Sequence, residues 1–173
     1  MILLKTFAEK AAWDFVEKEK PNFDIATINP PLVLGPIVHY LNSLEAINTS
    51  NQRVRDFIQG QMKDKITPTG TFIWVDVRDV ALAHVKAIEV SEAGGQRFFV
   101  TAGYFSNKEI ADVIRDTHPQ LASKLPPKDA HSDLPKDIYA IDNSKSKNVL
   151  GLEYRPFKET ISDTVDSLLA VGA

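Results

Sequence analysis

Short runs of β-forming residues alternate with amphipathic segments along this chain, and that alternation constrains its fold more than any other feature. Apolar residues at helical spacing predict a helix over residues 3–20, which Pro21 and Asn22 end. Residues 23–28 are rich in β-branched types and predict a buried strand, and residues 29–36 predict a proline-containing loop. Strands separated by helices indicate an α/β layer fold.

The same pattern continues to the end of the chain. Asp76 and Ser106 each stand before a helical run with an acid three residues later, as N-caps do. The other expected elements are a helix at 54–62 capped within 48–50, strands at 71–75 and 96–101, helices at 76–90, 106–117, 144–150 and 158–169, and an irregular excursion at 119–138.

Composition restricts the classes of function. A chain of 173 residues with 43% apolar content predicts one domain, residues 1–173, with its own core. The net charge of -3 offers no basic face, so nucleic acid is not an expected partner. No run approaches the length of a membrane span, and Lys5, Glu9 and Lys10 interrupt the apolar start too early for a signal peptide. The absence of cysteine suits a reducing compartment, so the expected location is cytoplasmic.

Taken alone, the residues say little about chemistry. The four histidines share no metal-ligand spacing with nearby acids, so no metal site is expected, and no glycine-rich phosphate loop is present. Residues 29–36 follow a strand and could form a cleft wall, although a rigid structural loop is equally consistent with them. Asp76 and Asp79 could be an acid/base pair, but a helix cap is the favoured interpretation.

Several motifs in order carry a resemblance. They are Lys5-Thr6-Phe7-Ala8-Glu9-Lys10-Ala11-Ala12-Trp13, Asn29-Pro30-x-x-Val33-x-Gly35-Pro36, Asn48-Thr49-Ser50, Val75-Asp76-Val77-Arg78-Asp79-Val80-Ala81-x-Ala83-His84, Lys145-Ser146-Lys147-x-x-Leu150-Gly151 and Lys158-Glu159-Thr160-Ile161-x-Asp163-Thr164. This series resembles the C-terminal half of extended short-chain dehydrogenase/reductases, and in particular the fungal NADPH-dependent ketoreductases, methylglyoxal reductases and carbonyl reductases. Dihydroflavonol and cinnamoyl-CoA reductases are plant relatives.

The resemblance implies a Rossmann-like fold, of which this chain would supply a few parallel strands with helices and the substrate-binding lobe. It also implies reduction of ketones or aldehydes with NADPH by a Tyr-x-x-x-Lys pair, whose members share one helix face. Lys5 matches the lysine, as catalytic and cofactor-binding residue. Met1 stands at the tyrosine position, and a thioether cannot donate the proton that a tyrosine hydroxyl would supply.

Other site residues follow from the resemblance. It implies that Pro30 and Val33 line the nicotinamide side of the cleft and that Ser50 reaches the cofactor phosphates. Leu34, Ile37 and Tyr40 would face a small carbonyl substrate.

Two hypotheses follow. In the first, the chain is a truncated reductase, weakly active or inactive, because the glycine-rich turn and the tyrosine are absent from it. In the second, it is a non-catalytic binding or assembly module. Helix 3–20 would then form a homodimer or pair with a full-length reductase. Unpaired strand edges and apolar helix faces would also predict marginal stability and self-association.

Overall fold

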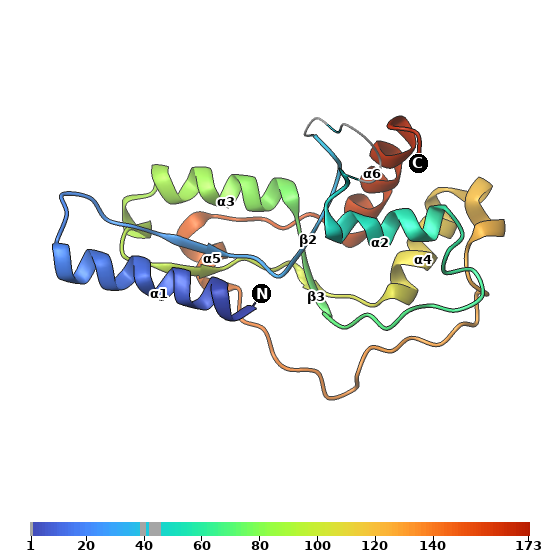
Figure 1. The fold of residues 1–173 in the computed structure, drawn as a ribbon, viewed down its shortest axis with the longest axis horizontal. Helices are drawn as coiled ribbons and strands as arrows, with labels where there is room; N and C mark the ends of the chain where they lie inside the picture. The colour runs from blue at the N-terminus through green and yellow to red at the C-terminus, as the bar shows by residue number, and fades with distance from the viewer. Residues whose placement is uncertain (1, 39–40, 42–45) are drawn as a thin grey trace.

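A computed structural model describes residues 2–38, 41 and 46–173 of the chain (Figure 1). The α/β class predicted from the sequence is confirmed. In chain order the elements are α1 (Ile2–Glu19), β1 (Thr27–Asn29), β2 (Leu32–Leu34), α2 (Thr49–Ile58), β3 (Ile73–Asp76), α3 (Val77–Glu89), β4 (Arg97–Phe99), β5 (Gly103–Tyr104), α4 (Asn107–Thr117), α5 (Ser144–Leu150) and α6 (Phe157–Ala170), with 3₁₀ turns at Ser91–Ala93 and Pro119–Lys124.

The strands form two small sheets. β1 pairs in parallel with β4, and Ile28 lies opposite Phe98. β2 pairs in parallel with β3, with Val33 opposite Val75, and β5 adds to β3 in the antiparallel direction. Pro30 and the residue after it separate β1 from β2, because proline has no backbone N–H to donate to a ladder. The chain therefore leaves the first sheet at this point and enters the second.

Two sequence predictions need correction here. The segment 29–36, expected to be a loop, contains β2, because pairing with β3 overrides the signal of the neighbouring prolines. The strand expected over 23–28 begins only at Thr27, and Phe23, expected to be buried in it, is 56% exposed.

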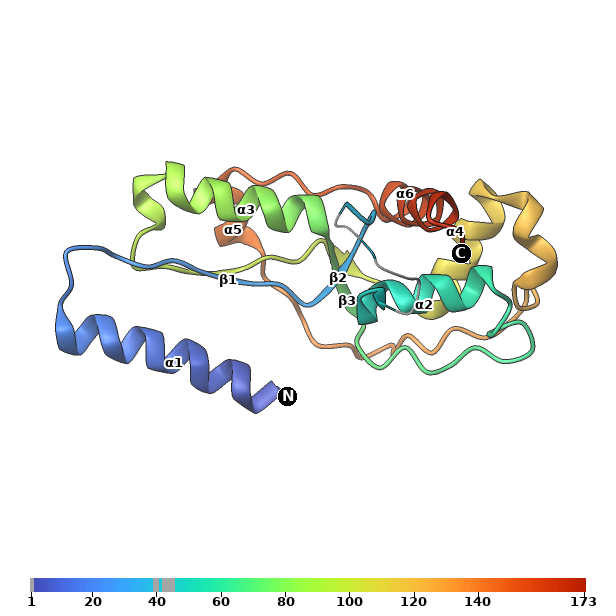
Figure 2. The same cartoon turned by 45° about the horizontal axis from the view of Figure 1, so that its top comes forward.

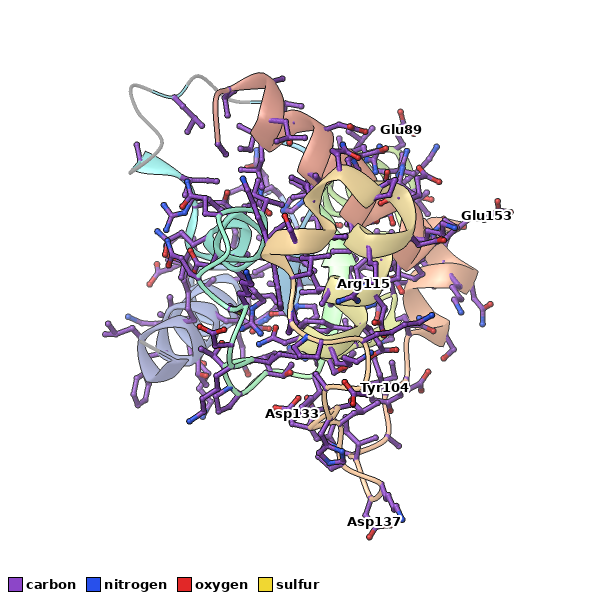
Figure 3. The ribbon with its side chains drawn as sticks, turned by 90° about the vertical axis from the view of Figure 1, so that its right-hand side faces the viewer. Glu89, Tyr104, Arg115, Asp133, Asp137 and Glu153 are labelled. Carbon is purple, nitrogen blue, oxygen red and sulfur yellow. The ribbon has the colours of Figure 1, made fainter. Side chains whose placement is uncertain are left out.

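Two apolar clusters form the core of the described residues. One lies around the first sheet, α3 and α5, and includes Phe98, Val75 and Leu150. The other lies among α2, α4 and α6 and includes Phe57 and Phe105; Figure 3 views this group of helices from the side. The second cluster is the body of the lobe that faces away from α1.

Three of the predicted caps are confirmed, whereas Asn48 begins α2 without a side-chain cap bond, and this helix, expected over 54–62, spans Thr49–Ile58. The side chain of Asp76 accepts a hydrogen bond from the backbone N–H of Arg78 at the start of α3. Ser106 and Glu109 form the reciprocal capping box that opens α4. Gly151 ends α5 in the left-handed conformation, with φ of 65°, which glycine adopts without strain.

Asp76 also connects the two clusters. It is fully buried. In addition to its bond from Arg78, it accepts a hydrogen bond of 2.6 Å from Thr160 Oγ1 on α6. Arg78 in turn donates to Asp163 on α6 at 2.6 Å, and Asp79 pairs with Arg155. Burial would raise the pKa of Asp76, but the hydrogen bonds from Arg78 and Thr160 hold it below the usual value. The motif is thus a helix cap joined to a structural network between α3 and α6.

The irregular surface segment predicted over 119–138 is only partly confirmed: Pro119–Lys124 forms a 3₁₀ turn, and Leu121 and Leu125 are buried in the core, whereas the chain after them runs over the surface to α5 (Figure 1). Two side chains labelled in Figure 3 hold it: Asp133 accepts from Thr69 N and Oγ1 at 2.6 Å each, and Tyr104 donates to Tyr139 O at 2.7 Å. These bonds fix a loop that has little regular structure of its own.

Helix α1 runs along the outer side of β1, and Figure 2 shows it separated from the other helices. Three of its large apolar side chains face outward: Leu4 is 72% exposed, Phe7 62% and Phe15 51%, whereas Trp13 and Val16 are partly buried. The sequence prediction that this helix presents an uncovered apolar face is therefore confirmed for the described side chains. An apolar helix face of this kind is typical of a surface that another element covers.

Candidate functional site

A groove of about 500 Å³ lies between α1 and the end of β1, and it brings together two of the residues singled out from the sequence. Lys5, on α1, and Pro30, directly after β1, both line it, and both are exposed. The remaining lining residues are Thr6, Glu9, Thr27, Ile28, Asn29 and Arg97. The groove lies beyond the carboxyl end of a parallel strand, where ligands bind in open α/β sheets.

The floor of this groove is a chain of polar contacts centred on Glu9. Arg97 Nε on β4 donates to Glu9 Oε1 at 2.6 Å, and Thr27 Oγ1 on β1 donates to the same oxygen at 3.2 Å. Asn29 Nδ2 donates to Thr27 Oγ1 at 3.3 Å. The hydrogen bond from Arg97 holds the pKa of Glu9 below its usual value despite partial burial. A carboxylate is thus fixed one helical turn from Lys5.

Glu9, Thr27 and Arg97 were not singled out from the sequence. Glu9 could have been noticed, because it stands four residues after Lys5 and so shares its helix face. Arg97 gave no signal, because only the register of β1 against β4 places it beside Thr27.

A second, smaller cavity of about 70 Å³ lies between residues 33–38 and the start of α2. Val33 and Leu34 line it, together with Asn48, Asn51 and Val77 among others. Ser50 lies beside the cavity, where its hydroxyl accepts a hydrogen bond of 3.2 Å from Asn48 Nδ2. Val33 and Leu34 therefore line this cavity, Ser50 is joined to its wall only through Asn48, and Lys5 and Pro30 line a separate groove.

Asn51 is another residue that the sequence did not reveal. It is 4% exposed, and its Nδ2 donates to Gly35 O at 2.9 Å. Within the described part of the chain its Oδ1 has no hydrogen-bond partner, although it is buried. A buried acceptor without a donor is costly and would be satisfied by an N–H or O–H group.

The predicted substrate-facing residues lie in different settings. Leu34 is only 1% exposed and belongs to the cluster among α2, α4 and α6. Ile37 is half-buried against that cluster, and its backbone N–H donates to Ser167 Oγ on α6 at 3.0 Å. Tyr40 lies outside the described residues.

Within the described ranges, no group of three or more His, Cys, Asp or Glu side chains is arranged to hold a metal ion. No described helix combines the length and the apolar character that crossing a membrane requires.

Comparison with known proteins assigns the class. No family model matches the sequence. The ketoreductase azaE of Aspergillus niger is 55% identical over 166 residues, which cover 95% of this chain and 49% of that protein. The NADPH-dependent methylglyoxal reductase GRE2 of Saccharomyces cerevisiae is 35% identical over 169 residues, again 95% of this chain and 49% of the relative. Gre2 of Candida albicans, solved in complex with NADPH, superposes with a TM-score of 0.84 at 34% identity, over 96% of this chain and 50% of that one.

The chain therefore belongs to the short-chain dehydrogenase/reductase class, of which it represents the C-terminal half. Within the class it is similar to a fungal ketoreductase and to fungal methylglyoxal reductases. It spans about half the length of these curated relatives.

Proposed function

We propose that these 173 residues form the substrate-side half of a reductase that uses NADPH to convert ketones or aldehydes into alcohols. The observation that carries the proposal is the groove shared by Lys5 and Pro30 at the carboxyl end of β1. The relationship to NADPH-dependent methylglyoxal reductases supports the choice of cofactor and of a small carbonyl substrate. We also propose that residues 1–173 form a single domain.

The residues present fit the nicotinamide end of NADPH. A groove of about 500 Å³ is in the size range of small-ligand sites, and its exposed lysine and the amide of Asn29 offer polar partners for a ribose. The buried Oδ1 of Asn51, close to Val33 and Ser50, would accept a hydrogen bond from an N–H or O–H of a bound ligand. Bound NADPH would supply the hydride.

In this proposal the chain's own residues bind and orient. Lys5 would hold the nicotinamide ribose and, by its positive charge, lower the pKa of a neighbouring tyrosine so that the tyrosine releases a proton readily. Pro30 and Val33 would form the wall beside the nicotinamide, and Ser50 would reach the phosphates at the start of α2. Leu34, Ile37 and Tyr40 would shape the substrate side.

The chain carries Met1 four residues before Lys5 and has no glycine-rich turn for the nucleotide. We therefore expect the 173 residues alone to be inactive or weakly active until another polypeptide segment supplies both features. The open edge of β1, between α1 and α3, is the surface on which we expect that segment to add its strands. The proposed compartment is the cytoplasm, because a chain without cysteine gains nothing from an oxidising one.

A chimera tests this proposal. The 173 residues are joined to the part of the Aspergillus niger ketoreductase that they do not cover, and oxidation of NADPH by a simple ketone is followed. We expect turnover that falls by about 100-fold or more in Lys5→Ala, because the tyrosine that donates the proton would lose the charge that lowers its pKa. Lys10→Ala, on the same helix and also exposed, is the matched control. Equal activity in the two variants would contradict the role of Lys5.

The exposed face of α1 favours a second function, that of a non-catalytic assembly module. Leu4, Phe7 and Phe15 would then pack against a second copy of the chain or a full-length reductase. Analytical gel filtration with and without a full-length relative measures this directly. Co-elution that is lost when Phe7 and Phe15 are replaced by Gln would support it, and separate elution at all concentrations would exclude it.

A further inference from the structure

We propose that Glu9, held by Arg97 and Thr27, is the latch that fixes α1 to the sheet and thereby positions Lys5 in the groove. This inference rests on the proposed function, because it assigns Glu9 as a positioning residue for the lysine of that site.

Glu9 joins α1 to the sheet through hydrogen bonds to two strands. Both of its carboxylate oxygens face Arg97, with Nε at 2.6 Å from Oε1 and Nη2 at 3.4 Å from Oε2. Thr27 adds a bond from β1, so one side chain of α1 reaches both paired strands. Two parallel N–H···O contacts fix direction as well as distance, which a lysine in place of Arg97 would not do.

The rest of α1 offers little apolar attachment. In the described part of the helix only Glu9, Trp13 and Val16 are partly buried, and they recur at the spacing of one helix face. The large apolar residues Leu4 and Phe7 point to solvent instead. Apart from the partly buried Trp13 and Val16, the described apolar side chains of this helix do not attach it to the sheet, so the bonds of Glu9 to two strands have a large share in fixing its position.

The latch lies one turn from Lys5. Four residues advance a helix by about 6 Å, and residues so spaced lie on one face. Lys5 and Glu9 both line the groove, as this spacing requires. Any tilt of α1 that follows from loss of the latch therefore moves Lys5 relative to Pro30 on the opposite wall.

The experiment uses the full 173-residue chain, whose lack of cysteine allows two unique labelling sites. Spin labels at Asp14→Cys on α1 and Ala81→Cys on α3, both exposed positions, report the distance between the helices. We expect one narrow distance distribution that broadens in Glu9→Ala, together with hydrogen exchange in α1 that is about fivefold faster. Glu17→Ala, an exposed glutamate on the same helix, is the matched control and should change neither measurement.

Exchanging the charges of Glu9 and Arg97 provides a second test of the inference. The double variant Glu9→Arg with Arg97→Glu restores the pair in reverse and should restore the narrow distribution. In the chimera described above, Glu9→Ala should lower kcat while leaving KM for the ketone nearly unchanged, and the exchanged pair should recover kcat. Unchanged distances and exchange in Glu9→Ala would overturn the latch. The distance and hydrogen-exchange measurements involve neither NADPH nor a carbonyl. They therefore test the role of Glu9 even if the proposed function is wrong.

Discussion

Replacement of Asp76 by alanine is predicted to destabilise the fold more than any other single change to its polar network. Asp76 is fully buried and accepts three hydrogen bonds from Arg78, at 2.8, 2.9 and 2.7 Å, and one from Thr160 at 2.6 Å. Its removal leaves the Arg78 cation without its buried partner, at a cost of about 3–5 kcal/mol. The Arg78 side chain is 29% exposed, so water compensates in part and the lower end, about 3 kcal/mol, is expected.

Urea unfolding followed by circular dichroism measures this cost. With an m-value of about 2 kcal/mol/M, the midpoint should fall by roughly 1.5 M. Asp163→Ala removes the other carboxylate bonded to Arg78, but that side chain is 38% exposed, so less than about 1 kcal/mol is expected. If the two variants shifted the midpoint equally, Asp76 would not be the junction between α3 and α6, and the reasoning would be refuted.

Three further outcomes are expected. Ser106→Ala removes the capping box with Glu109 and should cost about 1 kcal/mol in urea unfolding. Gly35→Ala should cost about 1–3 kcal/mol in the same assay, because φ is +132° and the added Cβ would lie 2.7 Å from Val77 Cγ1. Glu9 has a pKa below its usual 4.5, so the latch is fully present above that value and is lost as the pH falls through the lower folded pKa; hydrogen exchange in α1 across this range checks the sign.

The helices of this chain were readable from the sequence because their signals are local. The Asp76 cap, the Ser106–Glu109 box and Gly151 are each set by residues within one turn, and the structure bears out all three. β2 was missed because its three residues lie between prolines, and only the distant β3 supplies the ladder that makes it a strand.

The candidate site was readable only in part, for the same reason. Lys5 and Pro30 could be named from motifs, but their meeting in one groove depends on how α1 lies along β1. Arg97 enters the site through strand register, and Asn51 through the packing of α2 against Gly35. Neither contact produces a recognisable spacing of residues along the chain. The sequence could not predict these two residues because their positions depend on contacts between distant segments.

Calorimetric titration with NADPH tests the central claim most directly, that these residues are the substrate-side half of a reductase. The account predicts no saturable binding and no ketone reduction by the 173-residue chain alone, and both in the chimera with the Aspergillus niger ketoreductase. Micromolar binding accompanied by turnover in the isolated chain would contradict it, because the tyrosine and the nucleotide loop would then have replacements among these residues.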